Sequence, residues 1–432
     1  MRPDDGGERS APVASPRARL LAIGDELTHG HLVDTNSPWL ARELESVGIV
    51  VDGGATVGDD LALLTAAIRD ACAAADVVVA TGGLGPTEDD RTRHAAAAAA
   101  GVDLVHDEVS WQQILGWFAQ HGRDVPESNR RQALVPVGAF AMPNAFGTAP
   151  GFRIRIGRGW FFAMPGVPRE MRGMTETFVL PLLRDVLGAT GVVHSHWVHL
   201  LGPREADAGE RIADLMRMRG STRVGITAHN GLLTVRIAVV ADVPEVARAE
   251  AERVAAEVRL RFADVIVHEG QQTLAAAVVD CLRERGLRLA VAESCTGGRL
   301  AGALTDVGGS SDVFDAGFVT YANHAKSALL GVPTDTIERH GAVSAEVAAA
   351  MAEGAASRSG ATFAVSITGV AGPSGGTDEK PVGTVWFATS FRGATRTWKR
   401  RFPDLGRAFV RERACLEALA AILRELRADP PR

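Results

Sequence analysis

Hydrophobic and polar residues alternate along the chain in blocks that predict strands followed by helices. Short apolar runs such as Leu20–Ile23 and Val77–Ala80 end in clusters of glycine, aspartate and threonine. Helix-like stretches follow them, and Asn36–Val47 carries its apolar residues at helical spacing. Strands that alternate with helices predict a mainly parallel sheet that is covered on both faces. Ligands of such sheets bind outside the carboxyl ends of the strands, which draws attention to the loops after Ile23 and Ala80.

Residues 190–269 follow a different pattern, with the expected order strand–helix–strand–strand–helix–strand. Two runs of this segment, Arg223–Ala228 and Leu232–Val240, flank Asn230-Gly231, a dipeptide that is typical of two-residue hairpin turns. This order predicts a small split-βαβ domain.

The third segment, residues 270–432, again alternates helices and strands. Thr273–Arg285 has the spacing of an amphipathic helix, and the apolar run Leu287–Ala292 predicts a buried strand. A glycine-rich turn and a further helix follow from about Gly297. Farther along, the pattern predicts two strands, Phe363–Ile367 and Val382–Ser390, and a helix, Glu346–Ser357. This segment is therefore also expected to be α/β.

Composition excludes several classes of protein. Hydrophobic residues make up 46% of the 432 residues and charged residues 23%, which excludes wholesale disorder. The formal charge of −6 gives no overall field that recruits nucleic acid or anionic lipid. Residues 1–18 lack the apolar stretch of a signal peptide and predict a disordered tail. Because no apolar run approaches the roughly 20 residues that span a bilayer, we expect a soluble, cytoplasmic protein.

The stretch Glu293-Ser294-Cys295-Thr296-Gly297-Gly298 is the first candidate for chemistry. It places a hydroxyl at a sharp turn between a strand and a helix, where unpaired backbone N–H groups and the helix dipole favour negative charge. Ser294 is therefore a candidate nucleophile, with those N–H groups stabilising an oxyanion. A structural role is the alternative, in which Ser294 or Thr296 caps the helix and the two glycines allow close packing.

Tyr321 and Lys326 form the second candidate group. Tyr321 is the only tyrosine of the chain and follows the strand-like run Ala316–Thr320. A lysine that is desolvated loses its proton more readily, so Lys326 is a candidate base toward a serine. The alternative is a surface lysine beside a half-buried ring.

The glycine-rich stretch Thr368–Thr377 directly follows a predicted strand. Such a loop lets backbone N–H groups close on a phosphate or a carboxylate. It lacks the Gly-Lys-Ser/Thr ending of a P-loop, so hydrolysis of a nucleoside triphosphate is not supported. A plain flexible loop is the alternative.

A comparable loop, Thr81–Asp90, follows a strand of the first segment. Its glycines suit a phosphate, while Glu88, Asp89 and Asp90 are hard oxygen ligands suited to Mg²⁺ or Mn²⁺. Gly24-Asp25-Glu26 ends the first strand and adds a carboxylate at the same edge. In the alternative interpretation, Thr87 caps a helix and the acidic residues complement its dipole.

Taken together, these stretches resemble the CinA (competence/damage-inducible protein A) family along nearly the whole chain after the tail. The matching runs occur in the right order: Gly24–Leu27, Asp34-Thr35-Asn36, Thr81–Asp90, Asn144–Gly151, Met164–Met171, Glu293–Gly298, Thr320–Val332, Glu338–Met351 and Ser366–Gly383. The resemblance implies a molybdopterin-binding-like three-layer α/β/α domain at residues 19–189 and a small βαββαβ, KH-like linker domain at 190–269. It implies an α/β nicotinamide-nucleotide amidase domain at 270–432.

The amidase of this family hydrolyses the carboxamide of nicotinamide mononucleotide to nicotinate mononucleotide and ammonia, with no cofactor. The resemblance implies Ser294 as its nucleophile, with Lys326 and Tyr321 as activating neighbours. Lys326 is expected to take the serine proton directly or through Tyr321, while backbone N–H groups around Thr296–Gly298 hold the oxyanion. The substrate-binding residues implied by the resemblance are Thr296, Gly297, Gly298, Asn323, Thr368, Gly369, Ala371, Gly372 and Gly375.

Some members of the family also cleave ADP-ribose to AMP and ribose 5-phosphate in the first domain, with a divalent metal (Mg²⁺, Mn²⁺ or Co²⁺) and K⁺. The implied nucleotide-binding residues are Gly24, Thr81, Gly82, Gly83, Gly85 and Thr87, and the implied metal ligands are Asp25, Asp89 and Asp90. The alternative is a scaffold that binds nucleotide without hydrolysing it.

The resemblance also implies a homodimer whose ligands are small nucleotides. We expect no membrane partner and no direct nucleic acid, since affinity for DNA relies on neutralising its phosphates and this chain is acidic. Two other functions stay open: a molybdenum-cofactor enzyme of the molybdopterin-binding type, and a non-catalytic accessory protein of competence or DNA damage. Neither of them makes use of Ser294, Tyr321 and Lys326.

Overall fold

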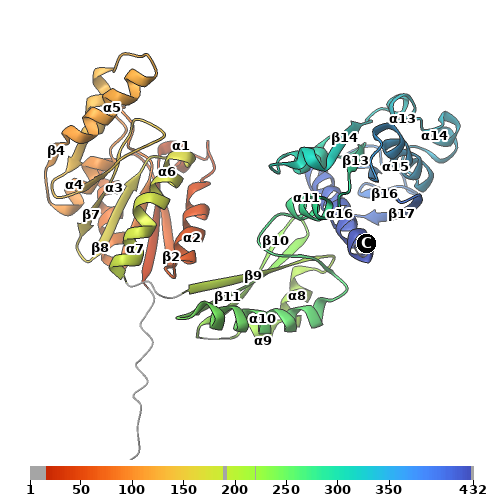
Figure 1. The fold of residues 1–432 in the computed structure, drawn as a ribbon, viewed down its shortest axis with the longest axis horizontal. Helices are drawn as coiled ribbons and strands as arrows, with labels where there is room; N and C mark the ends of the chain where they lie inside the picture. Colours follow the sequence, from red (N-terminus) through yellow and green to blue (C-terminus); the bar gives the residue numbers. More distant parts are fainter. Residues whose placement is uncertain (1–15, 188–191, 219, 430–432) are drawn as a thin grey trace, which may run out of the picture. The chain divides into compact units, whose positions relative to one another are not determined.

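A computed structural model describes residues 16–187, 192–218 and 220–429 of the chain (Figure 1). Within these residues, three main sheets of six, four and five strands are accompanied by a short two-stranded sheet. Residues 1–15 of the tail expected at 1–18 lie outside the described residues. The predicted boundary of the tail at residue 18 is wrong, because the first strand already begins at Arg17, which pairs with Val50.

The six-stranded sheet has the order β2-β1-β3-β8-β7-β6. The first four strands of this order are parallel. β7 pairs antiparallel with β8 on one side and with the edge strand β6 on the other. The mainly parallel sheet predicted for this segment is therefore confirmed. Its strands are β1 (Arg17–Ile23), β2 (Val50–Val57), β3 (Val77–Thr81), β6 (Phe140–Met142), β7 (Gly151–Ile156) and β8 (Gly159–Met164), and the separate pair is β4 (Leu104–His106) and β5 (Leu134–Pro136).

Helices cover both faces of this sheet, because its strands are apolar on both sides (Figure 1). Leu21 and Ile23 of β1 belong to a core that they share with α3 and α4, whereas Ala18 and Leu20 belong to a core shared with α2, α6 and α7. The helices are α1 (Asp25–Thr28), α2 (Asn36–Ser46), α3 (Leu61–Ala74), α4 (Thr92–Ala100), α5 (Glu108–Gln120), α6 (Pro168–Met174) and α7 (Leu180–Leu187). A single π-helical turn, Thr175–Val179, joins α6 to α7.

The four-stranded sheet has the order β10-β11-β9-β12 and confirms the predicted strand–helix–strand–strand–helix–strand pattern. The first helix of the pattern is divided into two short helices. Asn230 and Gly231 both have positive φ, 47° and 80°, as a tight hairpin turn between β10 and β11 requires. The elements are β9 (Val192–Leu201), α8 (Glu205–Arg211), α9 (Ala213–Met216), β10 (Thr222–His229), β11 (Leu232–Ala241), α10 (Pro244–Phe262) and β12 (Ile266–Glu269).

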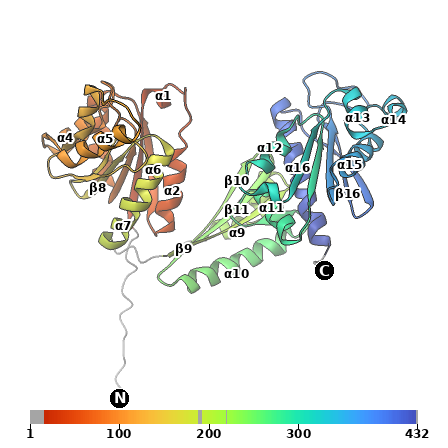
Figure 2. The same ribbon diagram turned by 45° about the horizontal axis from the view of Figure 1, so that its top comes forward.

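The five-stranded sheet has the order β14-β13-β15-β16-β17. β13 is parallel to both of its neighbours, whereas β16 pairs antiparallel with β15 and with β17. Leu289 and Val291 of β13 face a core shared with α11, α12 and α16, and Ala290 and Ala292 face a core shared with α13, α14 and α15 (Figure 2). The strands are β13 (Leu289–Glu293), β14 (Phe314–Val319), β15 (Phe363–Gly369), β16 (Thr384–Phe391) and β17 (Ala394–Arg401). The helices are α11 (Leu274–Glu284), α12 (Arg299–Thr305), α13 (Asn323–Leu330), α14 (Thr334–His340), α15 (Ala345–Ser359) and α16 (Arg407–Ala428).

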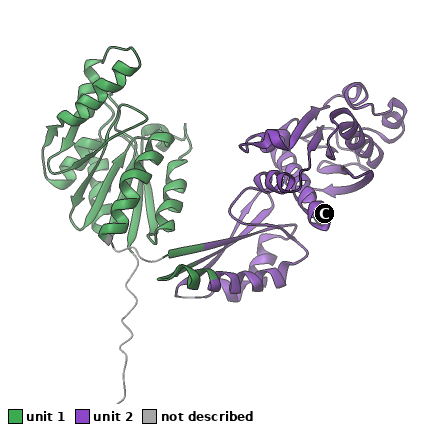
Figure 3. Cartoon of the chain, viewed as in Figure 1, with its two compact units in different colours: residues 1–194, 239–248 green, residues 195–238, 249–432 purple. Residues whose placement is uncertain are grey.

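The chain divides into two compact units (Figure 3). The first comprises residues 1–194 and 239–248 and holds the six-stranded sheet, and the second comprises residues 195–238 and 249–432 and holds the five-stranded sheet. Among the described helices of both units, none has the length and apolar character that crossing a membrane demands.

Candidate functional sites

Ser294 stands at a sharp turn at the carboxyl end of β13, which lies between β14 and β15 in the sheet. The chain has to leave the plane of the sheet at once to enter α12. Gly297 and Gly298 make this possible, since both have positive φ, 61° and 91°. The Ser294 amide donates to the carbonyl of Ile367 at 2.9 Å, which ties the turn to β15. The serine is 8% exposed, so its hydroxyl is nearly enclosed.

Lys326, on α13, lies beside this serine. Its Nζ is 3.2 Å from Ser294 Oγ and donates to the carbonyl of Thr320 at 2.9 Å. The side chain is buried, and burial lowers the pKa of its amine from the ordinary 10.5. The structure therefore brings two of the predicted catalytic residues together in a setting that favours a neutral amine.

The scarcity of lysine is a sequence signal that marks the same residue. Of the 46 basic residues that are lysine or arginine, only Lys326, Lys380 and Lys399 are lysines. An arginine does not lose its proton in a protein, so of these two basic residue types only lysine can act as a base. The contrast is visible in the sequence alone.

Glu293, which precedes the serine, has a role that the sequence analysis did not predict. Its carboxylate is fully buried and accepts hydrogen bonds from the amides of Gly298, Leu300 and Ala301 at 3.0, 3.1 and 2.8 Å. These amides form the start of α12, so the positive end of this helix faces Glu293. The buried carboxylate thereby fixes the turn that carries Ser294.

This arrangement corrects the oxyanion site predicted around Thr296–Gly298. The amide of Gly298 donates to Glu293, and that of Gly297 donates to the carbonyl of Ser294 at 3.1 Å. Both amides are therefore engaged within the protein. Of the three predicted amides, only that of Thr296 is without a hydrogen-bond partner in the described part of the chain, so it is the one of the three that is free to donate to an oxyanion.

Tyr321 makes no hydrogen bond to Ser294 or Lys326 in the described part of the chain. Its side chain is 58% exposed, and its hydroxyl accepts a hydrogen bond from Arg407 at 2.5 Å. Since Lys326 contacts Ser294 directly, the geometry favours direct proton transfer over a relay through Tyr321. Asn323, another predicted residue, is exposed at the first position of α13.

Helix α16 supplies two arginines at this site that the sequence analysis missed. Arg407 donates to Tyr321 and, at 2.8 Å, to the carbonyl of Gly372. Arg411 donates to the carbonyls of Cys295 and Thr296 at 3.0 and 2.7 Å, and so holds the turn after Ser294.

The same helix also contacts the β10–β11 hairpin. Arg413 donates to the carbonyl of Gly231 at 2.6 Å, and Glu412 pairs with His229 at 3.0 Å. One helix thus contacts both the candidate site and the hairpin turn.

The predicted glycine-rich loop at Thr368–Thr377 begins later than expected. β15 extends to Gly369, so Thr368 and Gly369 belong to the strand, and the hydroxyl of Thr368 donates to the carbonyl of Ala342 at 2.7 Å. Thr368 is therefore committed to the fold, and a Cβ at Gly369 would meet β16 at 2.7 Å. The other predicted residues lie beyond the strand: Ala371, which is buried, Gly372 and Gly375.

The first unit holds a cavity of about 690 Å³ at the carboxyl ends of β1 and β3. All six predicted nucleotide-binding residues line it: Gly24, Thr81, Gly82, Gly83, Gly85 and Thr87. The structure therefore gathers them at one edge of the sheet, together with Asp89 and Asp90. Asp59, which the sequence analysis did not select, lines the same cavity.

Asp90 shapes the glycine-rich loop of this cavity from within. Its carboxylate accepts from the amides of Gly85 and Thr87 at 2.7 and 2.8 Å, and the amide of Gly82 donates to the carbonyl of Met164 at 3.0 Å. These three amides already have partners, so the phosphate cradle predicted from them is wrong in that detail. A short polar loop closes on its own aspartate because unpaired amides are costly when buried.

The predicted metal ligands Asp25, Asp89 and Asp90 do not form a ready-made metal site. Across residues 16–187, 192–218 and 220–429, no three His, Cys, Asp or Glu side chains are grouped in a way that holds a metal ion. Asp25 pairs instead with Asp59, each accepting from the other's amide at 3.1 and 3.0 Å. Burial raises the pKa of Asp59, and the negative charges of Asp25, Glu26 and Asp89 raise this pKa further. The hydrogen bond from the Asp25 amide acts in the opposite direction and lowers it. These residues do not fit a preformed site of three ligands.

Three family models match the chain in sequence order. They are a probable molybdopterin binding domain over residues 19–185, a damage-inducible protein CinA KH domain over 195–267 and a CinA C-terminal domain over 271–426. A CinA-like protein of Geobacter sulfurreducens is 44% identical over 385 residues, which are 88% of this chain and 92% of the relative. The chain belongs to the CinA family. A second CinA-like protein, from Frankia casuarinae, is 43% identical over 96% of this CinA-family chain and 97% of its own length.

Solved structures of CinA proteins match shorter parts of this CinA-family chain. The competence/damage inducible protein CihA of Agrobacterium tumefaciens is 48% identical and matches 36% of this chain and 92% of its own, with a TM-score of 0.34. The protein CinA of Thermoplasma acidophilum is 32% identical over 39% of this chain and 98% of its own, with a TM-score of 0.37.

Proposed function

We propose that the five-stranded domain of this CinA-family protein hydrolyses a carboxamide, with nicotinamide mononucleotide as the substrate suggested by the family resemblance. The observation that carries this proposal is the 3.2 Å contact between Ser294 Oγ and Lys326 Nζ in a buried setting. Burial lowers the pKa of the lysine, and a neutral amine at this distance activates a serine hydroxyl.

The proposed reaction uses these two side chains and water. Lys326 accepts the hydroxyl proton while Ser294 Oγ bonds to the carboxamide carbon, and the Thr296 amide donates to the resulting oxyanion. Lys326 then returns the proton to the nitrogen, the C–N bond breaks and ammonia leaves. Water gives a proton to Lys326 and attacks the ester carbon, the bond to Oγ breaks, and the proton returns to Ser294.

Two buried hydroxyls support a ligand site at this turn. Among the described residues, Thr296 Oγ1 and Thr320 Oγ1 have no hydrogen-bond partner. Thr296 follows Ser294 by two positions, and the Thr320 carbonyl is the second acceptor of the Lys326 amine. Unpaired hydroxyls are costly in a protein core and are retained where a function requires them.

The test is ammonia release from nicotinamide mononucleotide, measured on the full chain and on Ser294→Ala. We expect the variant to lose the activity and keep its circular dichroism spectrum. Ser310→Ala is the matched control, because Ser310 is also 8% exposed and lies in the same domain away from Lys326. Normal turnover by Ser294→Ala contradicts the nucleophile, and an inactive but folded wild-type protein contradicts the substrate.

We also propose that the first unit binds a phosphate-bearing nucleotide, with ADP-ribose as the ligand suggested by the resemblance. The 690 Å³ cavity at the strand ends supports this, since it is lined by a glycine-rich loop in which Gly82 lies close to the carbonyl of Ile23. Titration calorimetry of ADP-ribose with the full chain, with and without Mg²⁺, tests it. We expect binding in both buffers. Absence of binding in both buffers contradicts the proposal. Binding only with Mg²⁺ contradicts the conclusion that Asp25, Asp89 and Asp90 do not fit a metal site.

A further inference from the structure

The hydroxyl of Ser294 lies between threonines of the two neighbouring strands. β13 is parallel to β14 on one side and to β15 on the other, and its last residue, Glu293, is in register with Val319 and Ile367. The residues that come next in these three segments are Ser294, Thr320 and Thr368. Since neighbouring strands lie about 4.8 Å apart, the two threonines flank the serine.

Thr320 lies on the side of the sheet from which the amine reaches the serine. Its amide still donates to the last carbonyl of β13 at 2.8 Å, so the ladder of backbone hydrogen bonds extends to this row. Residues two positions apart in a strand share a face. Ala292 and Phe318, two positions before Ser294 and Thr320, both belong to the side that packs against α13, α14 and α15. Lys326 comes from α13 and therefore from the same side.

The hydroxyl of Thr320 has no hydrogen-bond partner. Among the residues that the structure describes, only Thr296 and Thr320 have fully buried hydroxyls without one, and both lie at the turn that carries Ser294. Thr368, on the other side of the serine, donates to the carbonyl of Ala342. An unpaired buried hydroxyl lowers stability, so its presence beside the serine favours a group of the substrate as its partner.

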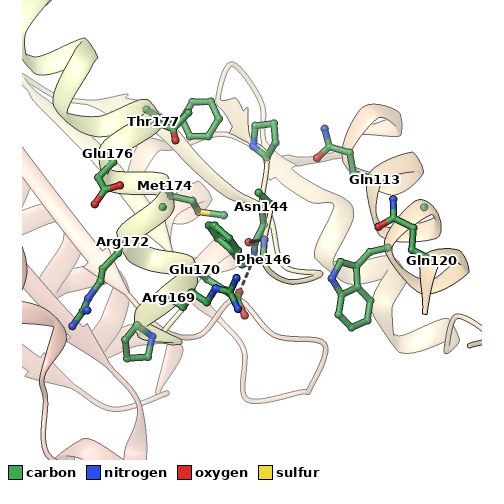
Figure 4. A pocket seen from close by; sticks show the side chains of 17 residues that line it. Gln113, Gln120, Asn144, Phe146, Arg169, Glu170, Arg172, Met174, Glu176 and Thr177 are labelled. Carbon is green, nitrogen blue, oxygen red and sulfur yellow. Dashed lines mark hydrogen bonds between the residues drawn. The ribbon is translucent and has the colours of Figure 1, made fainter. Parts of the chain in front are cut away.

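The wall of a cavity in the first unit shows the more usual arrangement. Asn144 lines this cavity, which has a volume of about 990 Å³ (Figure 4). Its Oδ1 accepts from the Phe146 amide at 2.9 Å, and its Nδ2 donates to the carbonyl of Ala149 at 3.0 Å and to Glu170 at 2.6 Å. The carboxamide of Asn144 thus has partners within the protein, whereas the hydroxyl of Thr320 lacks one.

We propose that the Thr320 hydroxyl holds the amide nitrogen of the substrate and, after ammonia has left, the water molecule that replaces it. This inference rests on the amidase reaction proposed for Ser294 and Lys326. One N–H group of the carboxamide donates to Thr320 Oγ1 while Lys326 gives its proton to the nitrogen. The C–N bond then breaks, and its electron pair leaves with ammonia.

The same hydroxyl serves the second half of the reaction. Water donates one hydrogen to Thr320 Oγ1 and gives its other proton to Lys326, while its oxygen bonds to the ester carbon and the bond to Ser294 Oγ breaks. One polar position is sufficient for both steps, because the leaving nitrogen and the attacking oxygen occupy the same place on the tetrahedral carbon and exchange protons with the same base.

The test compares Thr320→Val with Thr320→Ser in the full chain. Valine keeps the branched shape and the backbone carbonyl that accepts from Lys326, whereas serine keeps the hydroxyl and loses a methyl group. We expect Thr320→Val to lower kcat for ammonia release from nicotinamide mononucleotide by about tenfold or more, with KM within about threefold, and Thr320→Ser to stay within about fivefold of the wild type. If Thr320 only fills space, valine keeps the activity and serine loses it, and the inference is overturned.

Thr389→Val is the matched control. Thr389 is also buried in this domain, but it lies on β16 and its hydroxyl donates to Glu425. The variant therefore loses a buried hydroxyl away from the serine, and kcat should stay within about twofold of the wild type. An equal loss of kcat in Thr389→Val and Thr320→Val overturns the inference.

The ester p-nitrophenyl acetate separates the role of Thr320 from the choice of substrate. Its leaving group carries no N–H, so the initial burst of p-nitrophenol should keep its rate in Thr320→Val, while the steady-state rate, which depends on water, should fall by about tenfold or more. A wild type that hydrolyses the ester but not nicotinamide mononucleotide contradicts the proposed substrate, and the ester then decides the role of Thr320. A wild type that reacts with neither overturns both proposals. Equal turnover by Thr320→Val and the wild type overturns the inference alone.

Discussion

Replacing Lys326 with methionine separates its role as a base from its contribution to stability. Methionine keeps the unbranched apolar stem and removes the amine, which contacts Ser294 Oγ at 3.2 Å and the Thr320 carbonyl at 2.9 Å. Loss of general-base catalysis costs about 10²- to 10⁴-fold in rate. We therefore expect ammonia release from nicotinamide mononucleotide to fall by at least about 100-fold.

The expected effect on stability is small because two contributions oppose each other. Leaving the buried Thr320 carbonyl without its donor costs about 1–3 kcal/mol. Against this, the pKa of Lys326 is lower in the folded than in the unfolded chain, so burying the protonated amine costs stability below the lowered pKa, and this cost fades as the pH rises to 10.5. Each tenfold change in the acid dissociation constant of the amine corresponds to about 1.4 kcal/mol of this stability cost. We expect the Tm at neutral pH to change by no more than about 5 °C.

The pH dependence of the Tm gives this prediction a definite sign. The cost of burying the amine is fully present below the lowered pKa and disappears as the pH rises through 10.5, so the wild type should gain stability relative to Lys326→Met over that interval. Lys399→Met is the control, because Lys399 is exposed on β17 beside Trp386, and it should keep its activity within about twofold. A Lys326→Met protein that keeps more than a tenth of the activity, or a wild type that loses stability relative to it toward pH 10, refutes the reasoning.

Three other variants test separate parts of the structure. Tyr321→Phe should change kcat by less than about tenfold, since Lys326 reaches Ser294 without it, and a larger loss of kcat would restore the relay through Tyr321. Glu293→Gln replaces a carboxylate that accepts from three amides by a carboxamide with one acceptor oxygen. We therefore expect the free energy of unfolding to fall by about 2–4 kcal/mol in chemical denaturation, together with a lower kcat. An unchanged denaturation midpoint would contradict the role of Glu293 at α12. Gly82→Ala would place a Cβ 2.1 Å from the Ile23 carbonyl at φ +108° and should abolish binding of ADP-ribose while ammonia release persists. Gly138→Ala, with positive φ but no atom within 4 Å of the Cβ, is its control, and equal binding by both variants would argue against the close approach.

Local sequence signals predicted the parts of the fold that depend on neighbouring residues. The Asn230-Gly231 turn followed from the φ angles that these two residue types tolerate, and the structure confirms it. The apolar runs Val77–Ala80 and Leu287–Ala292 predicted buried strands, and the structure has buried strands at Val77–Thr81 and Leu289–Glu293. The pairing of Ser294 with Lys326 was implied by the family resemblance, and in the structure the two side chains lie 3.2 Å apart.

The errors arose where distant segments compete for the same polar group. Nothing near Ser294 in the sequence indicates Arg411, which lies 115 and 116 residues from the two carbonyls it holds. Thr368 was expected in a loop, but its hydroxyl is used by the carbonyl of Ala342, 26 residues away. Asp90 was expected to bind a metal, and the amides of its own loop engage its carboxylate first. Predicting such choices requires the positions of all the competing donors and acceptors.

The position of α16 limits how the length of the chain can change. Arg407 and Arg411, four residues apart, lie on one side of the helix and contact the candidate site, while Arg413 lies on another side and contacts Gly231. Each residue inserted into a helix rotates everything after it by about 100° and moves it along the axis by about 1.5 Å. An insertion or deletion between Arg411 and Arg413 would therefore separate the hairpin contact from the site contacts.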